Sequence, residues 1–219
     1  MPEVLKRRQH VSDLLAQVGA INADGWSKDD RIDYVLFRAQ LAGADFFGRR
    51  LNPEEQDPQV YVNECSNAIF TLLQKEYAPR RTRALAATAR MDQMPALLRT
   101  ARTNLKQPVK LYAQLAIPAA RGGDDLYTAS LETLAAELSS SERKRFIKAR
   151  DAALKALHEY ADWLEAGESA MPDWKPMGEA TYNDLLKQVL LLPLDASQVG
   201  ELGEVELARY RALEAMGAV

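Results

Sequence analysis

The sequence predicts an all-α protein, built as an irregular array of eight to ten helices whose corners are marked by prolines. Apolar residues recur at intervals of three and four along nearly the whole chain, and runs of alternating β-branched residues are absent. There are only 11 glycines. No clean repeat of fixed period occurs, which disfavours a regular tetratricopeptide or HEAT array.

The first two helices are predicted from their apolar stripes and their end signals. Residues 3–18 place valines and leucines on one face, and Gly19 is suited to end the helix. Residues 27–30, SKDD, resemble a capping box, with Ser27 as the cap and Asp30 reaching back. The helix that follows is expected to run to about Gly48.

Prolines open the next four predicted segments. Asp57 and Pro58 precede a helix that ends near Tyr77, and Pro79 opens an arginine- and alanine-rich segment to about Met91. Pro95 is predicted to start a separate helix, because proline lacks the N–H that an interior position needs and Met94 before it is pushed into a bend. Pro108 starts another helix, which Pro118 is expected to bend or end.

The last third of the chain carries the clearest capping signals. A turn at 122–125 leads into an apolar stripe, and residues 139–142, SSSE, cap the longest predicted helix, roughly 142–166. Residues 169–178 contain two prolines and are predicted to be an irregular linker. Helices are expected at about 179–192 and 195–216, the second one capped by Asp195 with Gln198.

Composition excludes several classes of protein. The net charge of -3 gives no general affinity for nucleic acid, and the single cysteine, Cys65, excludes an internal disulfide or a clustered-thiolate zinc site. No apolar run approaches the ~20 residues that cross a membrane, and the first residues lack the pattern of a signal peptide. We therefore expect one soluble helical domain or fragment over 1–219, with no membrane partner and a cytoplasmic location by default.

No set of residues predicts catalysis or metal binding in this chain. His158 and Glu159 begin like a His-Glu-x-x-His zinc motif, but Asp162 stands where the second histidine is needed. His10, the other histidine, lies on a different predicted helix. Cys65 falls on an apolar face, where a buried, unreactive thiol is expected. Nucleophile-elbow and phosphate-loop motifs are absent.

Residues 80–110 are strongly basic. They contain eight arginines and lysines against one acid, Asp92. The segment could form a groove for an anionic ligand, but solvated helix faces balanced by acids elsewhere, such as 159–168, are the simpler interpretation. Nucleic acid is disfavoured, because only Tyr112 is near enough to stack on bases.

A series of short stretches resembles the N-terminal half of the bacterial family known as domain of unknown function 885. The stretches come in order over residues 27–217, and they are SKDDRIDYVLFRAQL (27–41), DPQVYVNECSNAIFTLL (57–73), ARMDQMPALLRTARTNL (89–105), EYADWL (159–164), GEATYNDLLKQVLLL (178–192) and VGELGEVELARYRALEAM (199–216). The stretch from Met94 to Leu105 is the most telling part.

The resemblance implies a helical, metallocarboxypeptidase-like fold, similar to the thermolysin-type zinc peptidases, acting on peptides. The family's zinc motif would lie beyond the matched region, so no catalytic, cofactor or metal residue is expected here. We expect the chain to be a fragment or truncated product that lacks its C-terminal half and is inactive alone. Arg90, Arg99 and Asn104 could contact substrate or pin helices together, and pinning is the commoner role of such arginines.

An alternative interpretation is a stand-alone helical module that binds a peptide or an acidic partner through its basic face. A complete module should bury its apolar stripes and unfold cooperatively. A partial protein should instead expose an apolar face and self-associate.

Overall fold

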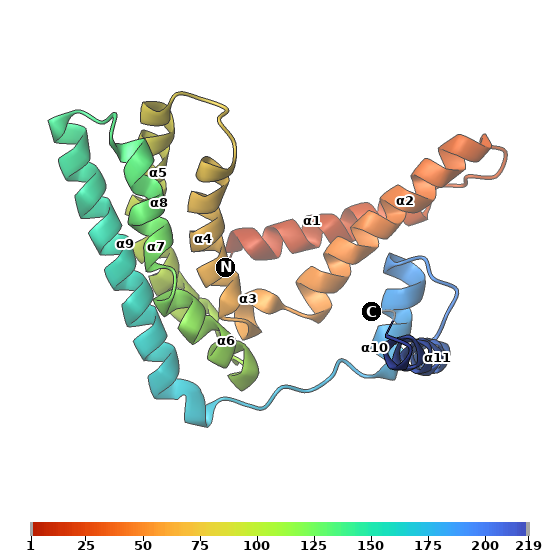
Figure 1. Ribbon diagram of the computed structural model, residues 1–219. Coiled ribbons are helices and arrows are strands. Elements are labelled where there is room, and N and C mark those ends of the chain that lie inside the picture. Colours follow the sequence, from red (N-terminus) through yellow and green to blue (C-terminus); the bar gives the residue numbers. More distant parts are fainter. Residues whose placement is uncertain (1, 218–219) are drawn as a thin grey trace. The chain divides into compact units, whose positions relative to one another are not determined.

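The computed structural model describes residues 2–217, which are all-α, with nine α-helices of six residues or more. The chain forms two compact units (Figure 1). Unit 2 consists of residues 52–174, and unit 1 of residues 2–51 together with 175–217.

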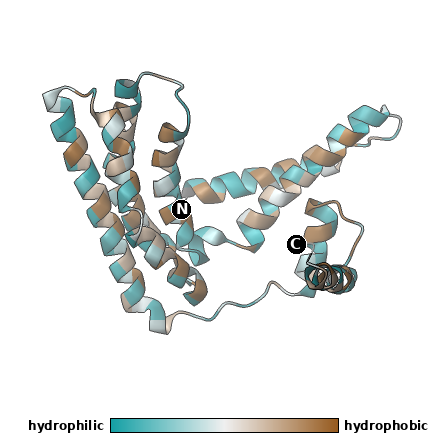
Figure 2. Ribbon diagram, in the orientation of Figure 1, coloured by the Kyte–Doolittle hydropathy of each residue, from teal (hydrophilic) through white to brown (hydrophobic). Residues whose placement is uncertain are grey.

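Unit 2 contains the main hydrophobic core. Its helices are α3 (Pro53–Gln56), α4 (Gln59–Gln74), α5 (Arg80–Asn104), α6 (Lys110–Arg121), α7 (Asp124–Tyr127), α8 (Ala129–Ala135) and α9 (Ser140–Gly167), followed by the 3-10 turn η2 (Glu168–Ala170). Hydrophobic and hydrophilic residues alternate along these helices (Figure 2). The longest two, α5 and α9, pack side by side, and both bury small residues, among them Ala84, Ala87, Ala149 and Ala153, all nearly inaccessible to solvent.

Pro95 lies inside a continuous helix, so the prediction that it starts a new one is wrong. α5 runs without a break from Arg80 to Asn104. Met91, Met94 and Leu98 stand on the same buried face, at most 2% exposed. Burial of such side chains stabilises by about 1.5–3 kcal/mol each, which outweighs the cost of about 3 kcal/mol for proline in a helix.

Prolines therefore mark fewer corners than the sequence predicts. α6 likewise continues through Pro118 to Arg121, because Ala113, Ala116 and Ala120 keep one buried face. At the start of α4, by contrast, Asp57 accepts a hydrogen bond from the Gln59 N–H at 2.8 Å, next to Pro58. That helix ends at Gln74, three residues before the predicted end.

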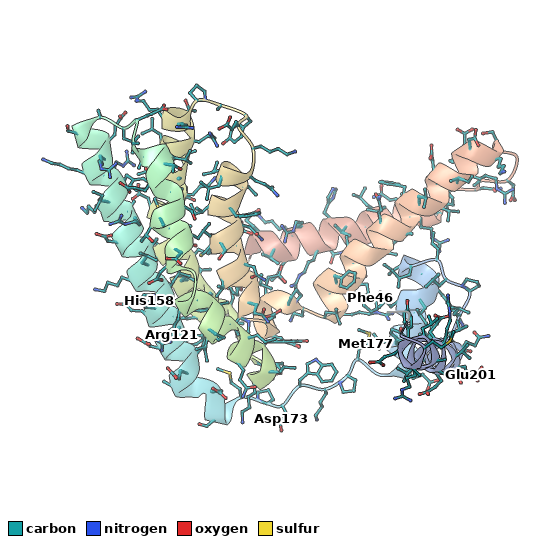
Figure 3. All side chains as sticks on the ribbon, viewed as in Figure 1. Phe46, Arg121, His158, Asp173, Met177 and Glu201 are labelled. Carbon is teal, nitrogen blue, oxygen red and sulfur yellow. The ribbon has the colours of Figure 1, made fainter. Side chains whose placement is uncertain are left out.

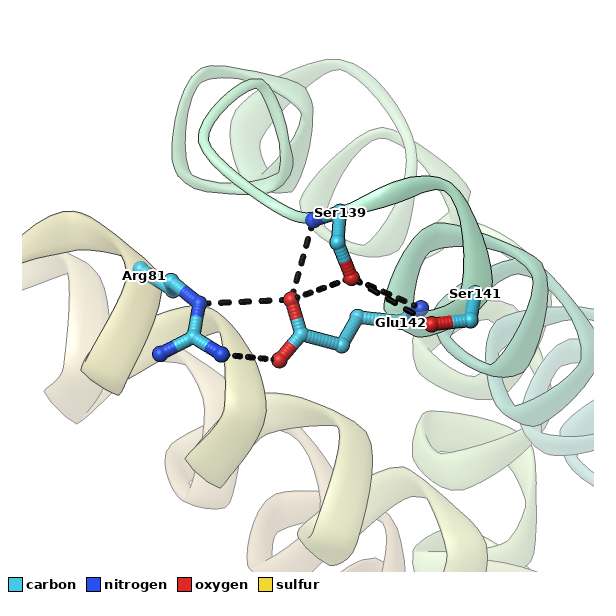
Figure 4. Close-up of polar contacts among 4 residues, drawn as sticks. All are labelled: Arg81, Ser139, Ser141 and Glu142. Atoms are coloured by element: carbon cyan, nitrogen blue, oxygen red, sulfur yellow. Dashed lines mark hydrogen bonds and ion pairs between the residues drawn. The ribbon is translucent and has the colours of Figure 1, made fainter.

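The predicted capping boxes of the last third are confirmed. The Ser139 hydroxyl accepts from the Glu142 N–H, and the Glu142 carboxylate accepts from the Ser139 N–H at 2.9 Å (Figure 4). Glu142 also binds Arg81 of α5, which joins the beginnings of α5 and α9. Asp195 and Gln198 form the same arrangement at the start of α11 (Ala196–Ala215).

Unit 1 has a small core. A helical hairpin of α1 (Pro2–Gly19) and α2 (Lys28–Asp45) is followed by one π-helical turn, η1 (Phe46–Arg50). The second part consists of α10 (Glu179–Asp184), the π-helical turn η3 (Leu185–Val189) and α11. The buried hydrophobic residues of this unit are Val18, Ala39, Phe46 and Leu186, and α11 buries none.

Arg83 is a buried cation that caps the C-terminal end of α4. Its guanidinium donates to the carbonyls of Leu72 (3.1 Å), Lys75 (3.4 Å) and Ala78 (3.1 Å), and the residue is 3% exposed. We predict that Arg83→Met lowers the free energy of unfolding by about 3 kcal/mol in urea titrations, because it leaves these carbonyls unsatisfied. Arg80→Met, on an exposed side chain three residues earlier, should change it by less than about 0.5 kcal/mol. Equal effects of the two variants would contradict this role.

The Glu142 contacts predict a pH dependence. Hydrogen bonds from the Ser139 backbone, Arg81 and the Ser139 hydroxyl lower the pKa of Glu142 from its ordinary 4.5 to about 2. A lowered pKa stabilises the fold above pH 4.5, and this contribution is lost as the pH falls towards 2. Thermal unfolding should therefore show Glu142→Gln less stable than the wild type at pH 7 and equal to it near pH 2. Glu137→Gln, an exposed control, should match the wild type throughout.

Candidate functional site

The residues singled out in the sequence are mostly structural. Arg90 donates to the Ala68 carbonyl and, at 3.1 Å, to the Thr71 hydroxyl, which fastens α5 to α4. Asn104 is 7% exposed and donates to the Tyr61 hydroxyl at 3.2 Å. Arg99 is exposed and has no hydrogen bond or ion pair with any residue in the described part of the chain. The structure does not bring the three together around one cavity.

The basic segment 80–110 is largely committed to packing. Arg81 and Arg83 hold helix ends, and Arg102 donates to the Glu159 carbonyl at 2.7 Å with its guanidinium 5.7 Å from the centre of the Trp163 ring. The one acidic residue of the segment, Asp92, accepts a hydrogen bond from Arg145 of α9 at 3.0 Å. These arginines join neighbouring helices, so they do not form a continuous groove for an anion.

The remaining titratable residues of unit 2 show no catalytic arrangement. His158 on α9 lies 2.9 Å from the Asp124 carboxylate, and Arg121 on α6 binds Asp162 and Glu165 (Figure 3). Burial raises the pKa of the Cys65 thiol to about 12, with Glu64 adding to the shift, so the thiol is unreactive at neutral pH. Within residues 2–217, no group of three or more His, Cys, Asp and Glu side chains could hold a metal ion.

A cavity lies in unit 1, where the sequence gave no signal. It has a volume of about 580 Å³ and is lined by α1, α2 and the two π-helical turns. Nine of its fifteen lining residues are apolar or glycine, and the other six carry polar or charged side chains. The lining residues are Ser12, Leu15, Ala16, Gly19, Val35, Arg38, Ala39, Ala42, Asp45, Phe46, Arg50, Asp184, Gln188, Val189 and Leu191. We call this cavity the unit 1 cleft.

The backbone around the unit 1 cleft departs from regular geometry in three places. Both π-helical turns contribute to the wall, through Phe46 and Arg50 of η1 and through Gln188 and Val189 of η3. Leu191 has a φ of 54°, in the left-handed region that a branched side chain rarely adopts. Such π-helical turns and strained residues are frequent at functional sites. This cleft is therefore the candidate functional site.

Ion pairs engage several of the charged residues that line the unit 1 cleft. Arg50 of η1 donates to the Asp184 carboxylate at 2.6 Å, and its guanidinium lies 5.5 Å from the centre of the Phe46 ring. Asp45 lies 3.4 Å from the Arg49 guanidinium, which also donates to the Ser12 hydroxyl. The two segments of the unit, far apart in sequence, are thus linked at one side of the cavity.

The family model described as "Bacterial protein of unknown function (DUF885)" matches residues 3–216. The chain belongs to this family. A solved structure described as "a putative lipoprotein of unknown function" from Shewanella oneidensis is similar in fold, with a TM-score of 0.78 at 24% identity. That match covers 94% of this chain and 38% of the other, so the chain spans well under half the length of that protein. No curated protein matches the chain.

The relation to this family, expected from the six stretches, is confirmed over a longer range than the 27–217 that they cover. No helix among the described residues is long and apolar enough to cross a membrane.

The wall of the unit 1 cleft depends on a close approach at Gly43. A Cβ at this position would lie 3.1 Å from Val189 Cγ1 of η3. We predict that Gly43→Val forces η3 away from α2 and lowers the free energy of unfolding by about 1–3 kcal/mol. Gly200→Val, in α11 with no atom within 4 Å of the added Cβ, is the matched control and should not destabilise. Thermal unfolding followed by circular dichroism measures both, and an equally stable Gly43→Val would contradict the close approach.

Proposed function

We propose that the chain is the N-terminal helical part of a zinc-dependent, carboxypeptidase-like hydrolase that acts on peptides, and that it is inactive alone. The described residues do not fit a zinc site, because the two histidines lie on α1 and α9 and no acidic or thiol group completes a ligand set. The metal ligands would therefore come from residues outside this chain. The family membership and the partial coverage of the longer solved chain support the proposal.

The observation that carries the proposal is the exposed apolar surface of unit 1. On α2, Ile32, Val35, Leu36 and Phe37 are each 44–51% exposed. On α11, a helix that buries no residue, four large apolar side chains are exposed, and these are Leu202, Val205, Leu207 and Tyr210. Contiguous apolar surface of this kind marks an interaction site. A further segment of a longer polypeptide would cover it.

The alternative, a stand-alone module that binds an acidic partner through its basic face, has less support. Most arginines of residues 80–110 are engaged with carbonyls, carboxylates or rings of neighbouring helices. A module of this kind also should not leave α11 without a buried face.

The self-association of the purified chain separates the two proposals. We predict concentration-dependent association in sedimentation velocity, weakened by Leu202→Glu with Tyr210→Glu, which place charges on one apolar side of α11. Ser197→Glu with Ala208→Glu adds the same charge on the opposite side of the helix and is the control. A chain that stays monomeric at all concentrations and unfolds cooperatively would favour the stand-alone module.

Hydrolytic activity tests the rest of the proposal. The DNA downstream of the Val219 codon should encode a His-Glu-x-x-His or His-Glu-x-x-x-His motif, in frame or one frameshift away. A protein extended through that motif should hydrolyse peptides, lose activity with a chelator and regain it with zinc. The present chain should show no hydrolysis. Zinc-dependent hydrolysis by the present chain would refute the assignment of the metal ligands to residues outside it.

A further inference from the structure

Some polar side chains of the unit 1 cleft have hydrogen-bond or ion-pair partners within the protein, and others have none among the described residues. Arg50 is paired with Asp184 at 2.6 Å, and Asp45 forms an ion pair with Arg49 at 3.4 Å, although its Oδ1 accepts no hydrogen bond within the described residues. Arg38 of α2 and Gln188 of η3 also line the cavity, but no residue in the described part of the chain forms a hydrogen bond or ion pair with either. One guanidinium and one carboxamide are therefore available to a ligand.

The rest of the wall sets the character of that ligand. Leu15, Ala16, Val35, Ala39, Val189 and Leu191 give an apolar surface, and a cavity of about 580 Å³ has the size of ordinary small-molecule sites. Arg38 is the one lining arginine without a carboxylate partner among the described residues, so the cleft suits a ligand that carries one negative charge. A guanidinium binds a carboxylate through two parallel hydrogen bonds, whereas a phosphate dianion would call for more positive charge than this rim supplies.

We propose that the unit 1 cleft binds a small amphipathic carboxylate, with the carboxylate on Arg38, a polar group on Gln188 and an apolar body against the wall formed by α1, α2 and η3. The two π-helical turns and the left-handed Leu191 support this independently, because such geometries persist where a ligand site needs them. A peptide C-terminus and a free aliphatic acid share this chemistry. The inference concerns unit 1 alone and stands whether or not the complete protein is a hydrolase.

Calorimetric titration of the whole chain with three probes tests the ligand class. The probes are N-acetyl-leucyl-phenylalanine, its C-terminal amide, and octanoate. We expect the peptide acid to bind at least about tenfold more tightly than its amide, since a charged hydrogen-bonded pair is worth a factor of this order. Binding of octanoate as well would indicate a general carboxylate site, and its failure to bind would indicate a peptide C-terminus. Absence of binding by both acids, or equal binding of peptide acid and amide, would overturn the proposal.

Variants of Arg38 tie the binding to this cleft. Arg38→Gln should abolish the preference for acid over amide, and Arg38→Lys should keep part of it, because an ammonium supplies charge without the paired donors. Arg31→Gln, on the same helix and outside the cleft lining, should bind both probes like the wild type. Circular dichroism checks that each variant is folded. An unchanged preference in folded Arg38→Gln would also overturn the proposal.

Discussion

The parallel packing of α5 against α9 is the constraint on which unit 2 depends. Both helices bury alanines, and arginines of α5 reach α9 near both ends, Arg81 to Glu142 and Arg102 to the Glu159 carbonyl. The neighbouring helices α4, α6 and α8 pack against one or both of them. Since these contacts also use the basic residues, the packing explains why a segment so rich in arginine leaves no anion groove.

The charges of α9 are also balanced by the helices that pack around it. The first half of α9 is basic and its second half acidic, which is the less favourable order for a helix dipole. Neighbouring helices compensate at both ends. Arg143 binds Glu132 and the Ala135 carbonyl near the start, and Arg121 bridges Asp162 and Glu165 near the end. Charge placement in α9 thus serves contacts between helices.

Sequence patterns predicted local features such as helix caps well, but they did not predict features that depend on contacts between distant segments. The capping boxes at Ser139 and Asp195 depend on residues three apart, so they could be read directly. The continuity of α5 could have been found from its buried stripe, which keeps its phase across Pro95, but local preference argued for a break. The unit 1 cleft joins residues between 12 and 50 with residues between 184 and 191 around π-helical turns, which leave no periodic signal. It could not have been found without the fold.

Hydrogen exchange, followed by mass spectrometry across the whole chain, tests most directly whether one α5–α9 pair organises the protein. We predict that α5 and α9 exchange slowest and together, that peptides before and after Pro95 are equally protected, and that α11 exchanges much faster. Two halves of α5 that differ widely in protection would show two separate helices meeting at Pro95. That result, or an α11 as protected as α5, would contradict the account.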